Sequence, residues 1–215
     1  MEIRKIIVLL VTFCLLLTSG CVSPKDIVLD PSCPVPCWRG ISYGMEKDEV
    51  MKLVLEMNDM KAEVREDLSS IKLSLRVRPG FWIYITFEDE KVVSFSFGDS
   101  KKLLSLEDAI AWYGEPESAV GLFYPGIFTG SEVSLCYTTV GVFFDTGWHE
   151  GPNGEVRLDP ETHVTSIHYI DMESTLANSA GFVCPEVSNY SIVSDWHGYG
   201  IYQTCNPETL DWCGE

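Results

Sequence analysis

The chain is poor in basic residues, and this shortage narrows the classes of partner that it could bind. It has 15 lysine and arginine residues against 32 aspartate and glutamate residues, and its formal net charge is −17 at pH 7. Nucleic acid and anionic lipid both favour basic surfaces, so we expect neither to bind this chain through charge. An acidic surface also aids solubility, so the acidic excess does not by itself indicate a basic partner.

The sequence also lacks the short motifs of common catalytic and nucleotide sites. It has no nucleophile elbow, phosphate-binding loop, dinucleotide fingerprint or helical zinc motif. Of its four histidines, His163 and His168 lie an odd number of residues apart on one expected strand. Such side chains point to opposite faces and cannot share a metal ion. We therefore predict no catalytic residues, no metal site and no cofactor.

No apolar run reaches the length of about 20 residues that a membrane-spanning helix needs. The longest run, Ile6–Leu17, follows Arg4 and Lys5 and precedes three small residues and Cys21. A basic start, a short apolar core and small residues before a cleavage point are typical of an export signal. Residues 1–20 are therefore predicted to be a signal peptide.

The end of this segment, Leu17-Thr18-Ser19-Gly20-Cys21, resembles the lipobox of bacterial lipoproteins, with its leucine one place earlier than usual. In that family the cysteine thiol receives a diacylglyceryl group and a peptidase cuts just before it. The resemblance implies lipid on Cys21 and a place at the extracytoplasmic face of a cell membrane. Two acyl chains hold a protein firmly, whereas one binds only marginally. An ordinary secretory signal or an uncleaved anchor is the alternative.

The remaining cysteines favour disulfides. Cys14 leaves with the signal and Cys21 carries the lipid, so six cysteines, an even number, stay in the exported chain. Metal binding and free thiols are the alternatives. We expect at least one bridge to fix the C-terminal region, either within it or back to the N-terminal pair. Cys136 is expected to pack in a strand as a small hydrophobe. The candidate disulfide cysteines are Cys33, Cys37, Cys184, Cys205 and Cys213.

Two stretches each show a helical period followed by strand alternation. In residues 37–99 a helix is expected over 46–57, and in residues 100–170 a second helix over 105–113 opens with the capping box that starts at Ser105. Antiparallel strands should follow each helix. The pattern predicts an α+β fold of two tandem helix-plus-antiparallel-meander units. The expected strands are 60–66, 71–77, 81–87, 92–97, 119–124, 132–138, 141–145 and 163–170.

Both ends of the mature chain lack an apolar period. Residues 21–36 contain four prolines and are predicted to form a lipidated tether, extended at about 3.1 Å per residue. Residues 171–215 hold three cysteines and several aromatics, and are predicted to be an irregular tail lying over the second unit.

Two motifs suggest families. Gly40-Ile41-x-x-Gly44-Met45-x-x-x-Glu49-Val50, with the later Tyr113-Gly114-Glu115-Pro116, resembles small envelope lipoproteins of the β-barrel-assembly accessory type and the related tandem fold of β-lactamase inhibitor proteins. Here the two halves of that signature lie in different units. Pro36-Cys37-Trp38-Arg39-Gly40-Ile41 resembles the opening of bacterial lipoproteins without an assigned activity. Both resemblances imply binding or scaffolding and supply no catalytic residues.

Aromatic residues in the tail form the candidate binding patch, Trp196, Tyr199 and Tyr202, because such side chains offer large contact areas with polar tips. Packing of the tail onto the sheet is the other interpretation.

The leading hypothesis is a lipid-anchored, non-enzymatic envelope module with a protein or peptide partner. The alternative is an extracytoplasmic hydrolase or carbohydrate-binding protein that uses these aromatics and the acidic connection, which could also bind calcium. That connection contains Asp145, Glu150, Glu155, Asp159 and Glu161.

Overall fold

The structure is a computed structural model, and it shows an α+β fold. It describes residues 23–33, 35–57, 61–67, 70–124, 130–147, 149–150, 154–174 and 191–204. The helices are α2 (Pro24–Val28), α3 (Lys47–Glu56) and α4 (Leu106–Tyr113), and η1 (Thr138–Val140) is a 3₁₀ turn. None of the described helices has the length and apolar character needed to cross a membrane. The strands are β1 (Cys37–Trp38), β2 (Ile41–Ser42), β3 (Lys61–Asp67), β4 (Ser70–Arg78), β5 (Phe81–Glu88), β6 (Lys91–Asp99), β7 (Leu104–Ser105), β8 (Ser118–Tyr124), β9 (Gly130–Tyr137), β10 (Val142–Thr146), β11 (His149–Glu150), β12 (Glu155–Leu158), β13 (His163–Ile170), β14 (Ser191–Asp195) and β15 (Gly200–Gln203).

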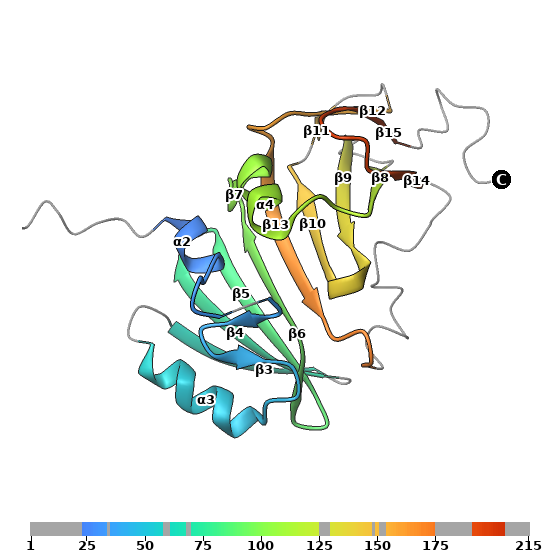
Figure 1. The fold of residues 1–215 in the computed structure, drawn as a ribbon. Coiled ribbons are helices and arrows are strands. Elements are labelled where there is room, and N and C mark those ends of the chain that lie inside the picture. The colour runs from blue at the N-terminus through green and yellow to red at the C-terminus, as the bar shows by residue number, and fades with distance from the viewer. Residues whose placement is uncertain are drawn as a thin grey trace, which may run out of the picture.

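A large antiparallel sheet runs through the molecule in the order β14-β8-β9-β10-β13-β6-β5-β4-β3 (Figure 1). Two short strands extend it, β11 beside β9 and β7 beside β13. Its centre is the pair β6–β13, in which Phe97 lies opposite Ile167 and Phe95 lies opposite Tyr169. Strands β5, β4 and β3 lie on one side of this pair. The other side holds β10, β9 and β8, with β14 at the edge.

Helices α3 and α4 form where the sequence predicts them. In α3, Val50 and Val54 are buried, which places its apolar stripe against the core. Helix α4 begins after Ser105, whose side-chain oxygen accepts the backbone N–H of Asp108 at 3.2 Å. That bond satisfies one of the N–H groups left free at a helix start. The helix ends at Gly114, whose positive φ of 85° suits glycine.

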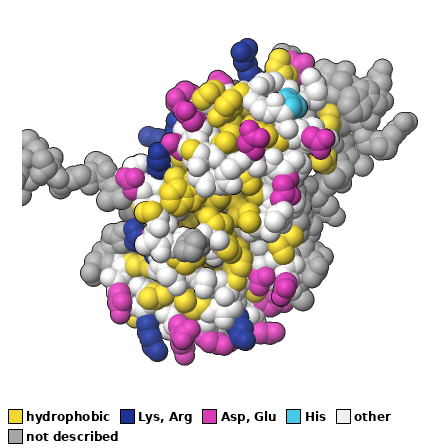
Figure 2. Space-filling model, in the orientation of Figure 1, with side chains coloured by type: hydrophobic (Ala, Val, Ile, Leu, Met, Phe, Trp, Pro, Cys, Tyr) yellow, Lys and Arg dark blue, Asp and Glu magenta, His cyan; other side chains and the backbone are white. Residues whose placement is uncertain are grey.

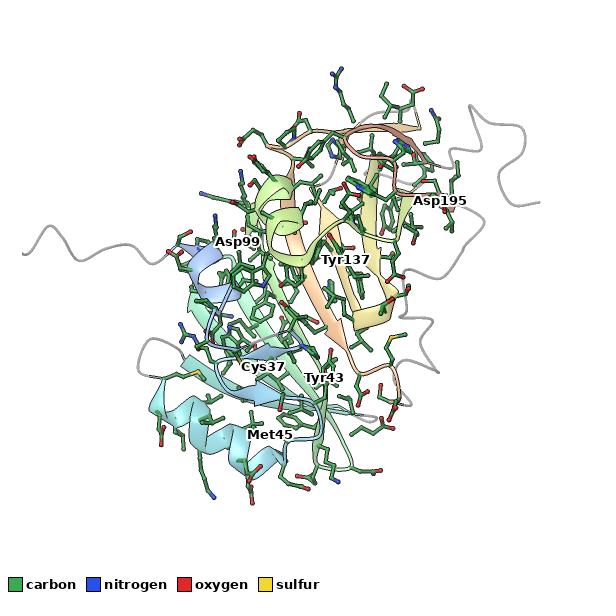
Figure 3. All side chains as sticks on the ribbon, viewed as in Figure 1. Cys37, Tyr43, Met45, Asp99, Tyr137 and Asp195 are labelled. Atoms are coloured by element: carbon green, nitrogen blue, oxygen red, sulfur yellow. A yellow bond between two sulfur atoms is a disulfide. The ribbon has the colours of Figure 1, made fainter. Side chains whose placement is uncertain are left out.

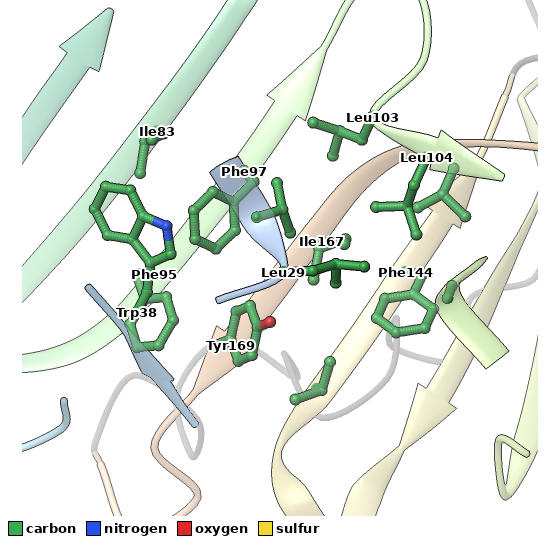
Figure 4. Packing of buried hydrophobic residues seen from close by; sticks show 14 of the residues in the cluster. Leu29, Trp38, Ile83, Phe95, Phe97, Leu103, Leu104, Phe144, Ile167 and Tyr169 are labelled. Atoms are coloured by element: carbon green, nitrogen blue, oxygen red, sulfur yellow. The ribbon is translucent and has the colours of Figure 1, made fainter. Parts of the chain in front are cut away.

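One side of the sheet carries the main hydrophobic core, and all three helices contribute buried residues to it. Trp38 meets Phe97 edge-on with ring centroids 5.3 Å apart, and Phe95 stacks on Tyr169 at 4.5 Å (Figure 4). Such aromatic pairs add to the free energy gained from burial alone. Because this core spans the β6–β13 pair, it joins side chains from both halves of the sheet.

The other side of the sheet receives no buried residue from any described helix, and we call it the second face. Phe143 and Ile170 form a small separate apolar cluster there. Polar residues from the central strands share this side of the sheet with them. The two faces therefore differ in chemistry. The first is apolar and covered by the helices, whereas the second carries both polar and apolar side chains.

A two-stranded ribbon of β12 and β15 packs against the same core as the helices. Val156, Leu158 and Tyr202 bury their side chains in that core. The ribbon passes so close to β8 that a Cβ added at Gly121 would lie 2.0 Å from the carbonyl oxygen of Gln203. Only glycine fits there, because any side chain would meet the backbone of β15.

The predicted extended tether is wrong for residues 23–33. Pro24 starts helix α2, and Ile27, Val28 and Leu29 are all buried in the main core. The Trp38 indole N–H donates a 2.7 Å hydrogen bond to the carbonyl oxygen of Ile27. Proline is well suited to the first turn of a helix, so its abundance here does not dictate an extended chain.

The prediction of an irregular tail is wrong where the structure describes that region. Strand β14 pairs with β8 at the edge of the main sheet, and β15 pairs with β12. Both strands have four or five residues, too few for an apolar period to be recognised. Their partners lie elsewhere in the sequence, so pairing could not be predicted locally.

Candidate functional site

A chain of five aromatic rings crosses the centre of the helix-bearing face. It runs from Tyr43 to Phe95, Tyr169, Tyr113 and Tyr137, and successive ring centroids lie 5.6, 4.5, 6.2 and 6.0 Å apart. We call this set the ring chain. Its members come from the β2–α3 connection, β6, β13, α4 and β9. The ring chain therefore connects the two halves of the sheet.

The hydroxyl groups of the ring chain are mostly satisfied within the protein. Tyr113 and Tyr169 share a hydrogen bond, and Tyr137 donates one of 2.8 Å to the carbonyl oxygen of Gly114. Burial raises the pKa of all the tyrosines in the set, so they stay neutral at physiological pH. The buried Tyr43 hydroxyl is the exception, because it finds no hydrogen-bond partner in the described part of the chain.

Hydrophobic side chains gather along the middle of the face shown in Figure 2, and acidic side chains, with fewer lysine and arginine side chains among them, lie around its margin. In Figure 3, Tyr43 and Met45 lie toward α3, whereas Tyr137 lies toward α4. Partly buried apolar side chains, including Met45 and Ile110, pack against the core around the ring chain. A surface strip of apolar side chains inside a mainly acidic margin suits an apolar partner with basic flanks.

The three residues of the predicted aromatic patch do come together, but Tyr202 is not a surface residue. It is only 2 % exposed, and its ring stacks at 5.7 Å on Trp196 and at 4.3 Å on His197. Its hydroxyl donates a 2.8 Å hydrogen bond to the carbonyl oxygen of Gly198. Tyr199 is 43 % exposed. These side chains therefore serve mainly to pack the segment between β14 and β15 onto the protein, and Tyr199 is the exposed one among them.

Among the candidate cysteines, Cys33 and Cys37 form a disulfide with each other, with Cα atoms 5.3 Å apart. Neither is then available to a tail cysteine. Cys136 is also disulfide-bonded, so the expectation that it packs as a free thiol is wrong. The remaining candidates lie outside the described residues, as does the lipid-attachment residue; these are Cys21, Cys184, Cys205 and Cys213.

A polar cluster on the second face was not predicted from the sequence. His168 Nε2 lies 3.1 Å from Asp145 Oδ2, and His168 Nδ1 lies 3.0 Å from Ser96 Oγ. Asp145 also accepts hydrogen bonds from the hydroxyls of Ser134 and Ser166. These residues come from β6, β9, β10 and β13, so the register of the sheet brings them together.

The pKa values of two carboxylates here, Asp145 in the cluster and Glu132 near it, are shifted in opposite directions. Burial would raise the pKa of Asp145, but its bonds with His168 and the serines outweigh burial and lower that pKa overall. Burial raises the pKa of Glu132 on β9 to about 7, and the charge of Asp145 adds to the rise. Tyr124 donates a hydrogen bond to Glu132. Asp145 is therefore charged at neutral pH, whereas Glu132 is only partly charged.

No group of three or more metal-ligating side chains occurs among the described residues.

Comparison with known proteins assigns no family. No protein-family model, curated protein or solved structure matches this chain.

Proposed function

We propose that the mature protein is a lipid-anchored binding or scaffolding module at the extracytoplasmic face of a cell membrane. The apolar run Ile6–Leu17, followed by small residues and Cys21, supports the anchor. Helix α2 begins at Pro24, three residues after Cys21, and burial in the core begins at Ile27. A lipid on Cys21 would keep the start of α2 within about 10 Å of its attachment point, because each residue spans at most roughly 3.5 Å.

The arrangement of the sheet supports two tandem units within this module. In each, one helix precedes four antiparallel strands: α3 before β3, β4, β5 and β6, and α4 before β8, β9, β10 and β13. The two sets meet through their last strands, β6 and β13. The ring chain spans the same junction. Two units joined by a shared sheet and core form a rigid platform, which suits a scaffold.

The observation that carries the binding proposal is the strip of hydrophobic side chains within a mainly acidic margin (Figure 2). Of the ring chain, Tyr43 and Tyr113 are partly exposed, whereas Phe95, Tyr137 and Tyr169 are buried beneath this region. Tyrosine and other aromatic side chains dominate the energetics of many protein interfaces. We propose that a protein or peptide partner places apolar side chains against this region and basic side chains against the margin. The chain's net charge of −17 favours association with such a partner.

Lipid attachment is tested by replacing Cys21 with alanine. Wild-type protein should incorporate a palmitate analogue and fractionate with membranes. The Cys21→Ala variant should incorporate none and should either leave the membrane or accumulate as an uncleaved precursor. Equal labelling of both proteins would contradict the anchor.

Partner binding is tested by placing a photo-crosslinking residue at Met45 or at Ile110 in protein held in native membranes. A matched control carries it at Leu55, which is 74 % exposed on α3. The proposal expects one shared protein adduct at positions 45 and 110 and none at position 55. Adducts of equal yield at all three positions, or adducts with lipid alone, would refute the assignment of this surface.

A further inference from the structure

Ser96, His168 and Asp145 form a hydrogen-bonded series on the second face. Ser96 Oγ lies 3.0 Å from His168 Nδ1, and His168 Nε2 lies 3.1 Å from Asp145 Oδ2. Hydroxyl, imidazole and carboxylate in this order are the parts of an activated-serine site. Here the two ring nitrogens take the opposite partners from those in the chymotrypsin arrangement, but the order of the groups is the same.

The protonation states follow from these contacts. Asp145 is ionised and can only accept hydrogen bonds, so His168 Nε2 carries a hydrogen directed at it. In the neutral ring, Nδ1 then has a free lone pair and accepts the hydroxyl hydrogen of Ser96. This tautomer is the one in which histidine can act as a general base toward Ser96.

Surrounding residues hold the series in place. Ser134 donates a 2.7 Å hydrogen bond to Asp145, and Ser166 donates another. The His168 ring stacks on Phe143, with centroids 4.3 Å apart and an interplanar angle of 12°. All of these groups stand on neighbouring strands of one sheet, which fixes their geometry more firmly than loops would.

The series is reachable from solvent. The side chains of His168 and Asp145 are 19 % and 21 % exposed, and Ser96 is partly exposed. Tyr84 lies directly opposite Ser96 on β5, and its ring stacks at 4.6 Å on Trp82. These two rings lie beside the serine and suit a flat, aromatic group of an incoming molecule.

We infer that Ser96 is a nucleophile toward carboxylic esters, especially those with an aromatic leaving group. Ser96 Oγ attacks the ester carbonyl carbon, and its proton passes to His168 Nδ1. Collapse of the tetrahedral adduct expels the alcohol, which takes that proton. Water then attacks the acyl-serine, with His168 accepting a proton and returning it to Ser96, and the carboxylic acid leaves. This activity goes beyond the binding role proposed above and does not depend on it.

The sheet limits the rate of this reaction. Strand β6 is hydrogen-bonded on both sides, to β5 and β13, so its backbone N–H groups are engaged in the ladders. They are not free to stabilise an oxyanion, and each missing donor costs about 100-fold to 1000-fold in rate. Slow turnover of activated esters is therefore expected, with efficient covalent capture of a phosphonate, which needs a single attack.

The experiment treats full-length protein, extracted from membranes in mild detergent, with a fluorophosphonate probe and with p-nitrophenyl acetate. Peptide mass mapping of the wild-type adduct should place the probe on Ser96. The labelling rate should fall about 100-fold or more in Ser96→Ala and His168→Gln. In Asp145→Asn it should fall and its pH profile should change, because Asp145 positions the histidine.

Ser74→Ala is the matched control, because Ser74 is a partly exposed serine opposite Tyr84 on the next strand and lies outside the series. It should label like wild type, and unfolding midpoints should confirm that each variant is folded. The inference is overturned if the wild-type adduct maps to another residue, or if no labelling occurs above that of Ser96→Ala. In that case the series is only a structural hydrogen-bond network.

Discussion

Replacing Glu132 with glutamine should remove a pH-dependent weakness of the fold. Burial, together with the charge of Asp145, raises the pKa of Glu132 from an ordinary 4.5 to about 7. The folded protein therefore holds this proton more tightly than the unfolded chain does. Stability is then lost as pH rises from about 4.5 to about 7, and the loss is complete above that range.

The size of the effect follows from the pKa difference. One pKa unit corresponds to about 1.36 kcal/mol, so the rise from 4.5 to about 7 has a ceiling of roughly 3 kcal/mol. Glu132 keeps some contact with solvent, which reduces the expected loss to about 2 kcal/mol. Glutamine cannot ionise and still offers an oxygen to the Tyr124 hydroxyl. Glu132→Gln should therefore be about 2 kcal/mol more stable than wild type at pH 8 and nearly equal to it at pH 4.5.

Urea unfolding of both proteins at pH 4.5, 6 and 8 measures this difference directly. Glu117→Gln provides a control of opposite sign, because hydrogen bonds from Thr138 and Thr139 lower the pKa of Glu117. A lowered carboxyl pKa contributes stability that is present above the ordinary pKa and lost as pH falls, so Glu117→Gln should lose stability at pH 8. If Glu132→Gln showed the same change of stability with pH as wild type, the assignment of a raised pKa would be wrong.

Three further variants test packing and the disulfide. Gly121→Ala should displace β15, because the added Cβ would lie 2.0 Å from the carbonyl oxygen of Gln203. A change in Trp196 fluorescence and faster hydrogen exchange in β15 would report the displacement. Tyr202→Phe should cost about 1 kcal/mol in urea unfolding, because the hydrogen bond to the Gly198 carbonyl is lost while the ring stays. Replacing Cys33 and Cys37 together by serine should lower the free energy of unfolding by about 2 kcal/mol, as expected for a short closed loop; an unchanged midpoint would contradict this.

Local patterns were enough to predict the helices and most of the main sheet. The stripe containing Val50 and Val54 and the cap at Ser105 are signals within single turns, and both elements appear at the expected residues. Proline content misled the prediction for residues 23–33, because Pro24 begins a helix. The order of the strands could not be predicted, because alternation fixes which side of a strand is buried and not which strand lies beside it.

The second-face cluster illustrates why sequence patterns missed a site. Ser96 and His168 lie 72 residues apart, and Asp145 lies on a third strand. Each is unremarkable among its neighbours, and only the pairing of β6, β13 and β10 brings them into contact. The odd separation of His163 and His168 predicts that they point to opposite faces of the strand, but it could not indicate what His168 faces.

The central position of β6 and β13 also determines how the chain must fold as it is made. Ser94 to Gly98 pair with Ser166 to Ile170, so β6 has an unpaired edge until about seventy more residues have been synthesised. The same strand carries Phe95 and Phe97, whose burial depends on the completed core. Contacts between such distant segments slow folding, because loop closure must precede the gain from packing. The N-terminal half should therefore remain prone to association with other chains until the C-terminal half arrives.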